Sequence, residues 1–221
     1  MLAERFPPSA PRPAAVLPTG VAAIDEAGDG GLPVGAITEV VALAPSAGGQ
    51  LLISRLLAAT RARRMRAALV DALDAFDPCS HEPPVLQHLV WVRCRTLDEA
   101  MHAADILVRD ANLALVMLDL RGGAPRAVRS VPATTWYRLQ RALERTDLAM
   151  VVFTTAAPSR PAFSRAPGPG PVGGLVGSAR LRLTLAAGFP LDALAGEQTG
   201  LAFHLPVEVE RNRVHEERRS A

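Results

Sequence analysis

Short apolar runs alternate with helix-like segments along most of this chain. Continuous apolar runs are typical of strands buried on both faces, as in a parallel sheet covered by helices. The alternation therefore predicts an α/β fold with a mostly parallel central sheet, flanked by helices and extended by antiparallel strands near the C-terminus. The expected strands are 36–43, 67–73, 89–93, 113–118, 148–154 and 179–185, with edge strands at 201–205 and 207–209. The expected helices are 51–66, 96–109 and 133–145.

The two ends of the chain differ from this core in composition. Residues 1–17 are rich in proline and are expected to form a flexible arm, and residues 211–221 form a charged C-terminal tail. The segment 156–174 is rich in Pro, Gly, Ser and Ala, which disfavour regular structure. Residues 18–210 are left as one core domain, which is large enough to bury its own apolar side chains.

Composition excludes several classes of protein. Apolar residues make up 49% of the chain, yet no apolar run reaches the roughly 18 residues that a membrane span needs. The N-terminus does not read as a signal peptide, so we expect a cytoplasmic protein with no membrane partner. The two cysteines, Cys79 and Cys94, are then expected as reduced thiols, and no ligand spacing indicates a metal site. All 24 basic residues are arginine, so no reaction that needs a lysine ammonium is available.

The stretch LAPSAGGQ, residues 43–50, lies where a strand-to-helix phosphate loop would lie. A working loop reads GxxxxGK[ST], in which backbone N–H groups cradle the phosphates, lysine contacts them and the hydroxyl holds magnesium. Here Leu43 stands at the first glycine, Gly48 at the second, Gly49 at the lysine and Gln50 at the hydroxyl. We therefore expect no ATP hydrolysis and no cofactor. Loose binding of a nucleotide or anion at the helix N-terminus stays open.

Asp119 ends an apolar strand, which is the position of a magnesium-linked aspartate in phosphate-loop enzymes. The alternative is an acid that caps the turn after the strand. Because the lysine and the hydroxyl are missing from the loop, the residues favour the capping role and leave Asp119 as a vestigial site.

Two arginine-bearing segments contain no acid, 121–143 and 156–191. Arginines on loops rich in Gly and Pro can follow a phosphate backbone without reading its sequence. The candidate DNA-binding residues are Arg121, Arg126, Arg129, Arg160 and Arg165. The alternative is an ordinary solvated surface. Trp136, Tyr137 and Phe163 are aromatic candidates for base stacking, although the first two are also expected as helix residues packed on the sheet.

Four short stretches, in this order, resemble the core of the RecA recombinase over roughly residues 18–214. They are PTG with ID and GGLPVG in 18–35, VDALDAFDP in 70–78, the segment from Gly173 to Leu181, and VEVERNR in 207–213. The resemblance implies a RecA-like three-layer core. It places Leu73 at the position of the catalytic glutamate, and a leucine cannot activate water. It also implies that Arg211 and Arg213 are interface residues.

A RecA-like chain without a working phosphate loop resembles the ImuA family, which is related to the cell-division inhibitor SulA. That resemblance implies a non-catalytic accessory protein in SOS mutagenesis and translesion synthesis. The partners it implies are an ImuB-like, Y-family-related protein, an error-prone DNA polymerase and single-stranded DNA, with RecA as a further candidate. Three alternatives stay open: a regulator of RecA filaments, a SulA-like division inhibitor, and an atypical DNA-dependent ATPase that uses Asp119 with arginine.

Overall fold

A seven-stranded sheet forms the centre of the molecule, with the strand order β5-β4-β6-β7-β3-β8-β9. The computed structural model describes residues 15–44, 47–123, 125–156, 175–185 and 205–213. Strands β3 to β8 run parallel, and β9 pairs antiparallel with β8. A separate two-stranded ribbon pairs β1 with β2. The expected α/β fold class, with a mostly parallel sheet and an antiparallel addition near the C-terminus, is confirmed.

The strands of the large sheet are short and mostly buried. The central ones are flanked on both sides by other strands, which fits their nearly continuous apolar sequences. The strands are β3 (Ile37–Ala42), β4 (Arg66–Asp71), β5 (Leu89–Arg93), β6 (Leu113–Asp119), β7 (Ala149–Thr155), β8 (Leu181–Leu185) and β9 (Val207–Asn212). The ribbon consists of β1 (Val16–Leu17) and β2 (Leu32–Pro33).

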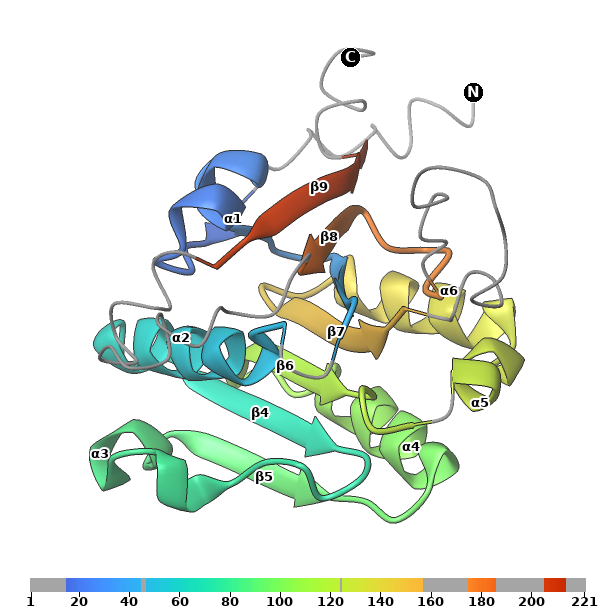
Figure 1. The fold of residues 1–221 in the computed structure, drawn as a ribbon, viewed down its shortest axis with the longest axis horizontal. Coiled ribbons are helices and arrows are strands. Elements are labelled where there is room, and N and C mark those ends of the chain that lie inside the picture. The colour runs from blue at the N-terminus through green and yellow to red at the C-terminus, as the bar shows by residue number, and fades with distance from the viewer. Residues whose placement is uncertain (1–14, 45–46, 124, 157–174, 186–204, 214–221) are drawn as a thin grey trace, which may run out of the picture.

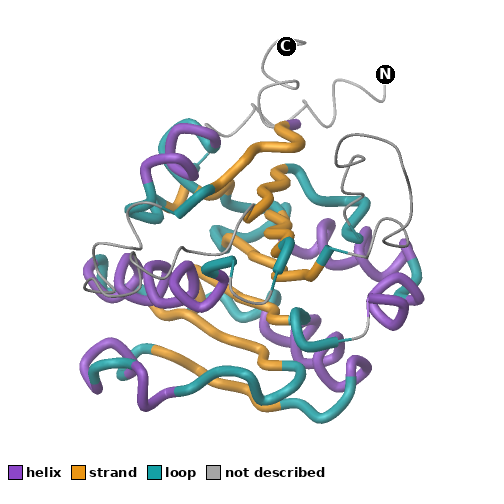
Figure 2. The backbone as a smooth tube through the Cα atoms, in the orientation of Figure 1, coloured by secondary structure: helices purple, strands orange, loops and turns teal. Residues whose placement is uncertain are grey.

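Helices cover both faces of the sheet and give three layers (Figures 1 and 2). One face carries α1, α2 and α3, and the other carries α4, α5 and α6. The helices are α1 (Ala22–Ala27), α2 (Gly49–Ala62), α3 (Pro83–Leu86), α4 (Leu97–Leu107), α5 (Pro125–Ser130) and α6 (Ala133–Leu143), with a 3₁₀ turn at Pro78–Ser80. No described helix has both the length and the apolar character needed to span a bilayer.

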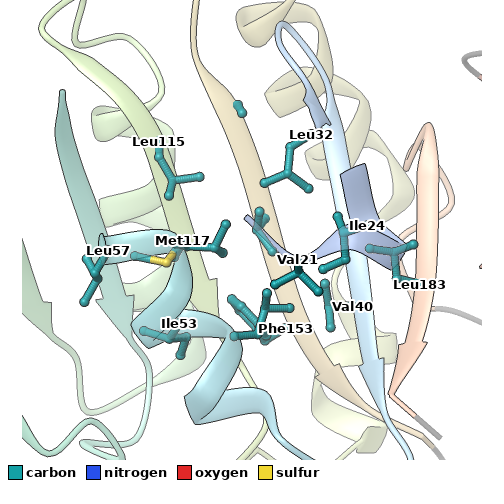
Figure 3. Packing of buried hydrophobic residues seen from close by; sticks show 14 of the residues in the cluster. Val21, Ile24, Leu32, Val40, Ile53, Leu57, Leu115, Met117, Phe153 and Leu183 are labelled. Carbon is teal, nitrogen blue, oxygen red and sulfur yellow. The ribbon is translucent and has the colours of Figure 1, made fainter. Parts of the chain in front are cut away.

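Two apolar cores lie on the two faces of the sheet, because successive residues of a strand point to opposite sides. Within β7, Phe153 belongs to the first core and Val152 to the second. Figure 3 shows the first core, where Ile53 and Leu57 of α2 meet Met117 and Phe153 of the sheet. In the second core the buried Trp136 of α6 packs with the sheet.

Most element boundaries agree with the sequence within two or three residues, but the short helices α1, α3 and α5 were not expected. Each has only four to six residues, which is too short to establish a helical period. Val16–Leu17, at the end of the expected N-terminal arm, pairs with β2. Strand β9 continues to Asn212.

Several predictions concern residues outside the described ranges. These are most of the arm (1–14), most of the Gly/Pro-rich segment (157–174), most of the first C-terminal edge strand (201–204) and the end of the tail (214–221). The proposed division into arm, core and tail stays a prediction.

Candidate functional site

The candidate site lies where the parallel strands β3, β4, β6 and β7 reach their carboxyl ends. In open α/β sheets this edge is where ligands bind. Strand β3 leads through residues 43–48 into α2, so LAPSAGGQ lies between the expected strand and the expected helix. Residues 45 and 46 are outside the described ranges.

Two adjacent glycines open helix α2, and they have different backbone conformations. Gly48 is the N-cap and adopts a left-handed conformation with φ of 88°, which glycine tolerates without strain. Gly49 is the first helical residue and is buried. Leu43, at the first glycine position of the motif, is 39% exposed. Gln50, at the hydroxyl position, donates from Nε2 to the carbonyl of Ala75 at 3.0 Å, which ties the start of α2 to the turn after β4.

Asp119 and Arg121 form a bidentate ion pair at the end of β6. Arg121 donates from Nε to Oδ1 of Asp119 at 2.9 Å and from Nη2 to Oδ2 at 2.6 Å. The backbone N–H of Arg121 also donates to Oδ1 at 3.1 Å. The Asp119 side chain is 2% exposed and that of Arg121 14%. Asp119 therefore caps the turn that follows its strand.

The side chain of Arg121 lies against Gly49. A Cβ atom built on Gly49 would be 1.7 Å from Nη1 and 2.7 Å from Cζ of Arg121. The guanidinium also lies 5.2 Å from the ring centroid of Phe153, and the Arg121 carbonyl accepts a hydrogen bond from Oγ1 of Thr155 at 2.8 Å. The lysine position of the loop motif is therefore covered by a cation from the turn after β6.

The position of the catalytic glutamate is apolar. Leu73 is 45% exposed and lies beside Gly122, where a Cβ atom would be 2.7 Å from its Cδ1. A small apolar pocket opens here, lined by Ala72, Leu73, Leu97, Leu120, Gly123, Ala127 and Val128. None of these seven described residues carries a base or a metal ligand.

The neighbouring acidic residues near the end of β4 make hydrogen bonds and an ion pair within the protein. Asp71 accepts hydrogen bonds from the backbone N–H groups of Ala75 and Phe76, each at 2.9 Å, and from Nε1 of Trp91 at 3.3 Å. Asp74 pairs with Arg93, and the hydrogen bond from that guanidinium lowers the pKa of the Asp74 carboxyl. Among the described residues, no group of three or more His, Cys, Asp or Glu side chains is arranged to hold a metal ion.

The predicted DNA-binding arginines are in different environments. Arg126 and Arg129 are exposed on α5, whereas Arg121 is ion-paired as described above. Arg160 and Arg165 lie outside the described residues. Of the aromatic candidates, Trp136 is buried and Tyr137 is 58% exposed, which agrees with the packing alternative for Trp136. Phe163 is outside the described ranges.

The predicted interface arginines lie at the end of the edge strand. Arg211 belongs to β9 and pairs in register with Arg182 of β8. Arg213 is exposed, and its backbone N–H donates to the carbonyl of Arg180 at 2.9 Å.

A buried polar network in the middle of the sheet was not predicted. Glu39 is fully buried in β3 and accepts hydrogen bonds from Arg182 Nε at 2.8 Å, Thr154 Oγ1 at 3.1 Å and the backbone N–H of Leu175 at 2.7 Å. Arg182 also donates to the carbonyl of Val176 at 3.1 Å. The network joins three strands to Leu175 and Val176, which follow the Gly/Pro-rich segment. Its signal in the sequence was a single acid within the apolar strand ITEVVA.

The PTG and ID stretches form a local structural motif. Asp25 accepts from the Thr19 backbone N–H at 2.8 Å, from Thr19 Oγ1 at 2.7 Å and from the Gly20 N–H at 3.0 Å. Arg55 of α2 donates to the carbonyl of Gly20 at 3.3 Å. The motif thus fixes α1 on the face that carries α2.

The sheet and the strand-to-helix loop after β3 together define a RecA-like α/β core. The RecA protein of Clavibacter michiganensis subsp. michiganensis (strain NCPPB 382) is 36% identical to the chain over 110 residues. The match covers 48% of this chain and 30% of that RecA. This similarity suggests membership of the RecA superfamily. No protein-family model matches the chain.

Proposed function

We propose that the chain is a non-catalytic, RecA-like accessory protein of damage-induced mutagenesis, similar to the ImuA family. The observation that carries the proposal is the loop at the start of α2, where Gly49 replaces the lysine and lies under the Arg121 side chain. The apolar Leu73 supports it further, because it can neither orient nor deprotonate a water molecule. Such a protein acts by binding partner proteins and single-stranded DNA during translesion synthesis.

A turnover assay tests the non-catalytic part of the proposal. Phosphate release from ATP with magnesium is measured with and without single-stranded DNA, for the wild-type protein and for Asp119→Ala. We expect no DNA-stimulated release from either. Stimulated release that Asp119→Ala abolishes would overturn the proposal in favour of an atypical ATPase.

The DNA-binding part rests on the exposed arginines of α5 together with Arg160 and Arg165. Charge reversal of all four is expected to abolish binding to single-stranded DNA. The pair Arg126→Glu and Arg129→Glu alone removes two phosphate contacts, which lowers the slope of log affinity against log salt by about 1.4. A matched control, Arg63→Glu with Arg66→Glu, changes the charge equally at the opposite edge of the sheet. Equal weakening by both pairs would mean that α5 is not the site.

The partners are tested by separate pull-downs with purified proteins. We expect the chain to retain an ImuB-like, Y-family-related protein and, through it, an error-prone polymerase. Retention of RecA and not of the ImuB-like protein would instead favour a regulator of RecA filaments.

A further inference from the structure

The two glycines at the start of α2 are needed for different reasons, and the second one depends on Arg121. Gly48 adopts a left-handed backbone conformation, so its requirement is conformational. Gly49 is helical, so other residues could adopt its backbone conformation. A glycine is needed there because a larger side chain would not fit. The space is taken by Arg121, whose Nη1, Cζ and Cδ atoms would lie 1.7, 2.7 and 3.2 Å from a Cβ on Gly49.

We propose that Arg121 blocks phosphate binding at the loop, because its side chain occupies the space beside Gly49 that a lysine side chain and a bound phosphate would need. The inference goes beyond the proposed function, because it makes the loss of phosphate binding depend on the side chain of Arg121, which a substitution can remove. It also predicts that restoring the loop motif alone does not restore nucleotide binding.

Arg121 is held in this position and cannot swing away freely. Its guanidinium makes two hydrogen bonds to Asp119, whose side chain is 2% exposed. The backbone on either side is also fixed, because the Arg121 N–H donates to Asp119 and the Arg121 carbonyl accepts from Thr155. Moving the guanidinium would leave a buried carboxylate without its ionic partner, which is strongly destabilising.

The charge of the pair suits a helix N-terminus that holds no anion. A lone guanidinium there would be repelled by the positive end of the helix dipole. Asp119 neutralises it through both carboxylate oxygens. The same contacts occupy the oxygens that a magnesium-linked aspartate would turn toward the metal. One arginine therefore removes the space for the lysine and engages the vestigial magnesium ligand.

A double-mutant cycle tests the contact itself. Urea unfolding midpoints are measured for the wild type, Gly49→Ala, Arg121→Ala and the double variant. We expect Gly49→Ala to lower the midpoint strongly in the wild type, and to leave it unchanged or raise it once Arg121 is alanine. Gly177→Ala is the matched control, since nothing lies within 4 Å of a Cβ there.

Equal losses from Gly49→Ala in both backgrounds would overturn the proposal. If Gly49→Ala prevents folding, the double variant is compared with Arg121→Ala alone. Equal folding of these two variants supports the proposal, and folding of Arg121→Ala but not of the double variant contradicts it.

A binding experiment tests the functional consequence. Leu43→Gly, Gly49→Lys and Gln50→Thr together restore the GxxxxGK[ST] motif, and this triple variant is compared with the same variant carrying Arg121→Ala. A fluorescent ATP analogue with magnesium is the probe. We expect binding at least ten-fold tighter when Arg121 is removed. Equal binding by the two variants, or no binding by either, would show that Arg121 is not the barrier. Neither result bears on turnover by the wild-type protein, which the ATPase assay measures separately.

Discussion

At the residue scale, the most unusual feature is the charge pair inside the sheet. Glu39 and Arg182 lie opposite each other on β3 and β8, and their side chains are 0% and 11% exposed. Burying two charges costs more than their attraction returns unless further hydrogen bonds satisfy them. Here Thr154, Leu175 and Val176 supply those hydrogen bonds. The network therefore satisfies both buried charges and links β3, β7 and β8 to residues 175 and 176.

Arg182→Met is expected to lower the free energy of unfolding by about 3–5 kcal/mol, because it leaves a buried carboxylate without its ionic partner. Urea denaturation measures the effect. As a control, Arg109→Met breaks the exposed pair with Asp105 of α4 and should cost less than about 1 kcal/mol. Similar losses for the two variants would contradict the assignment of Glu39 as a buried, charged acceptor.

His88 makes the stability depend on pH. Its ring nitrogen lies 2.8 Å from Oγ1 of Thr60, and burial, followed by the charge of Arg61, lowers its pKa from the ordinary 6.5. The unfolded chain then binds the proton more readily than the folded one. This contribution to stability is present above pH 6.5 and is lost as the pH falls through the lowered folded pKa.

We therefore expect the unfolding midpoint to fall between pH 7 and pH 5, and His88→Gln to flatten that dependence. Burial also lowers the pKa of His81, so part of the slope should remain. An unchanged slope in His88→Gln would contradict the prediction.

At the element scale, strands were predicted better than short helices. A buried strand such as β7 is marked by the uninterrupted apolar sequence LAMVVFT. Helix α5 consists of PRAVRS, in which Val128 is the one large apolar residue that reaches the core. Its position is set by packing against the sheet, which is a tertiary effect that a local pattern does not contain. Helix α1 is similar, because its start depends on Asp25.

Asp25→Ala is expected to loosen α1 and the β1–β2 ribbon. The change removes the acceptor for the N–H and hydroxyl of the buried Thr19 and for the Gly20 N–H, at a cost of about 1–3 kcal/mol. Hydrogen exchange of residues 19–34 should become faster than in the wild type, while exchange in the seven-stranded sheet stays unchanged. The adjacent, exposed Glu26 gives the control, and Glu26→Ala with equally fast exchange would contradict the role of Asp25.

At the scale of the whole molecule, the fold was predictable and much of the candidate site was not. The order of apolar runs fixed the fold class, and LAPSAGGQ located the loop. The environment of Gly49 could not be predicted from the sequence. Arg121 is distant along the chain and contacts Gly49 only after β3 and β6 have joined one sheet. Arg121 was predicted as a DNA contact from the charge of its segment. Its neighbour Asp119 lies just outside that acid-free segment and pairs with it through the turn.

The place of β3 in the sheet has a consequence for synthesis on the ribosome. Both its neighbours, β7 and β8, are made long after it. At about 5–20 residues per second, residue 155 at the end of β7 follows residue 42 by about 6–23 seconds. During that interval the apolar segment ITEVVA has no strand partner in the nascent chain. Slower translation lengthens this exposure, so the yield of folded protein should depend on chaperones that shield emerging chains.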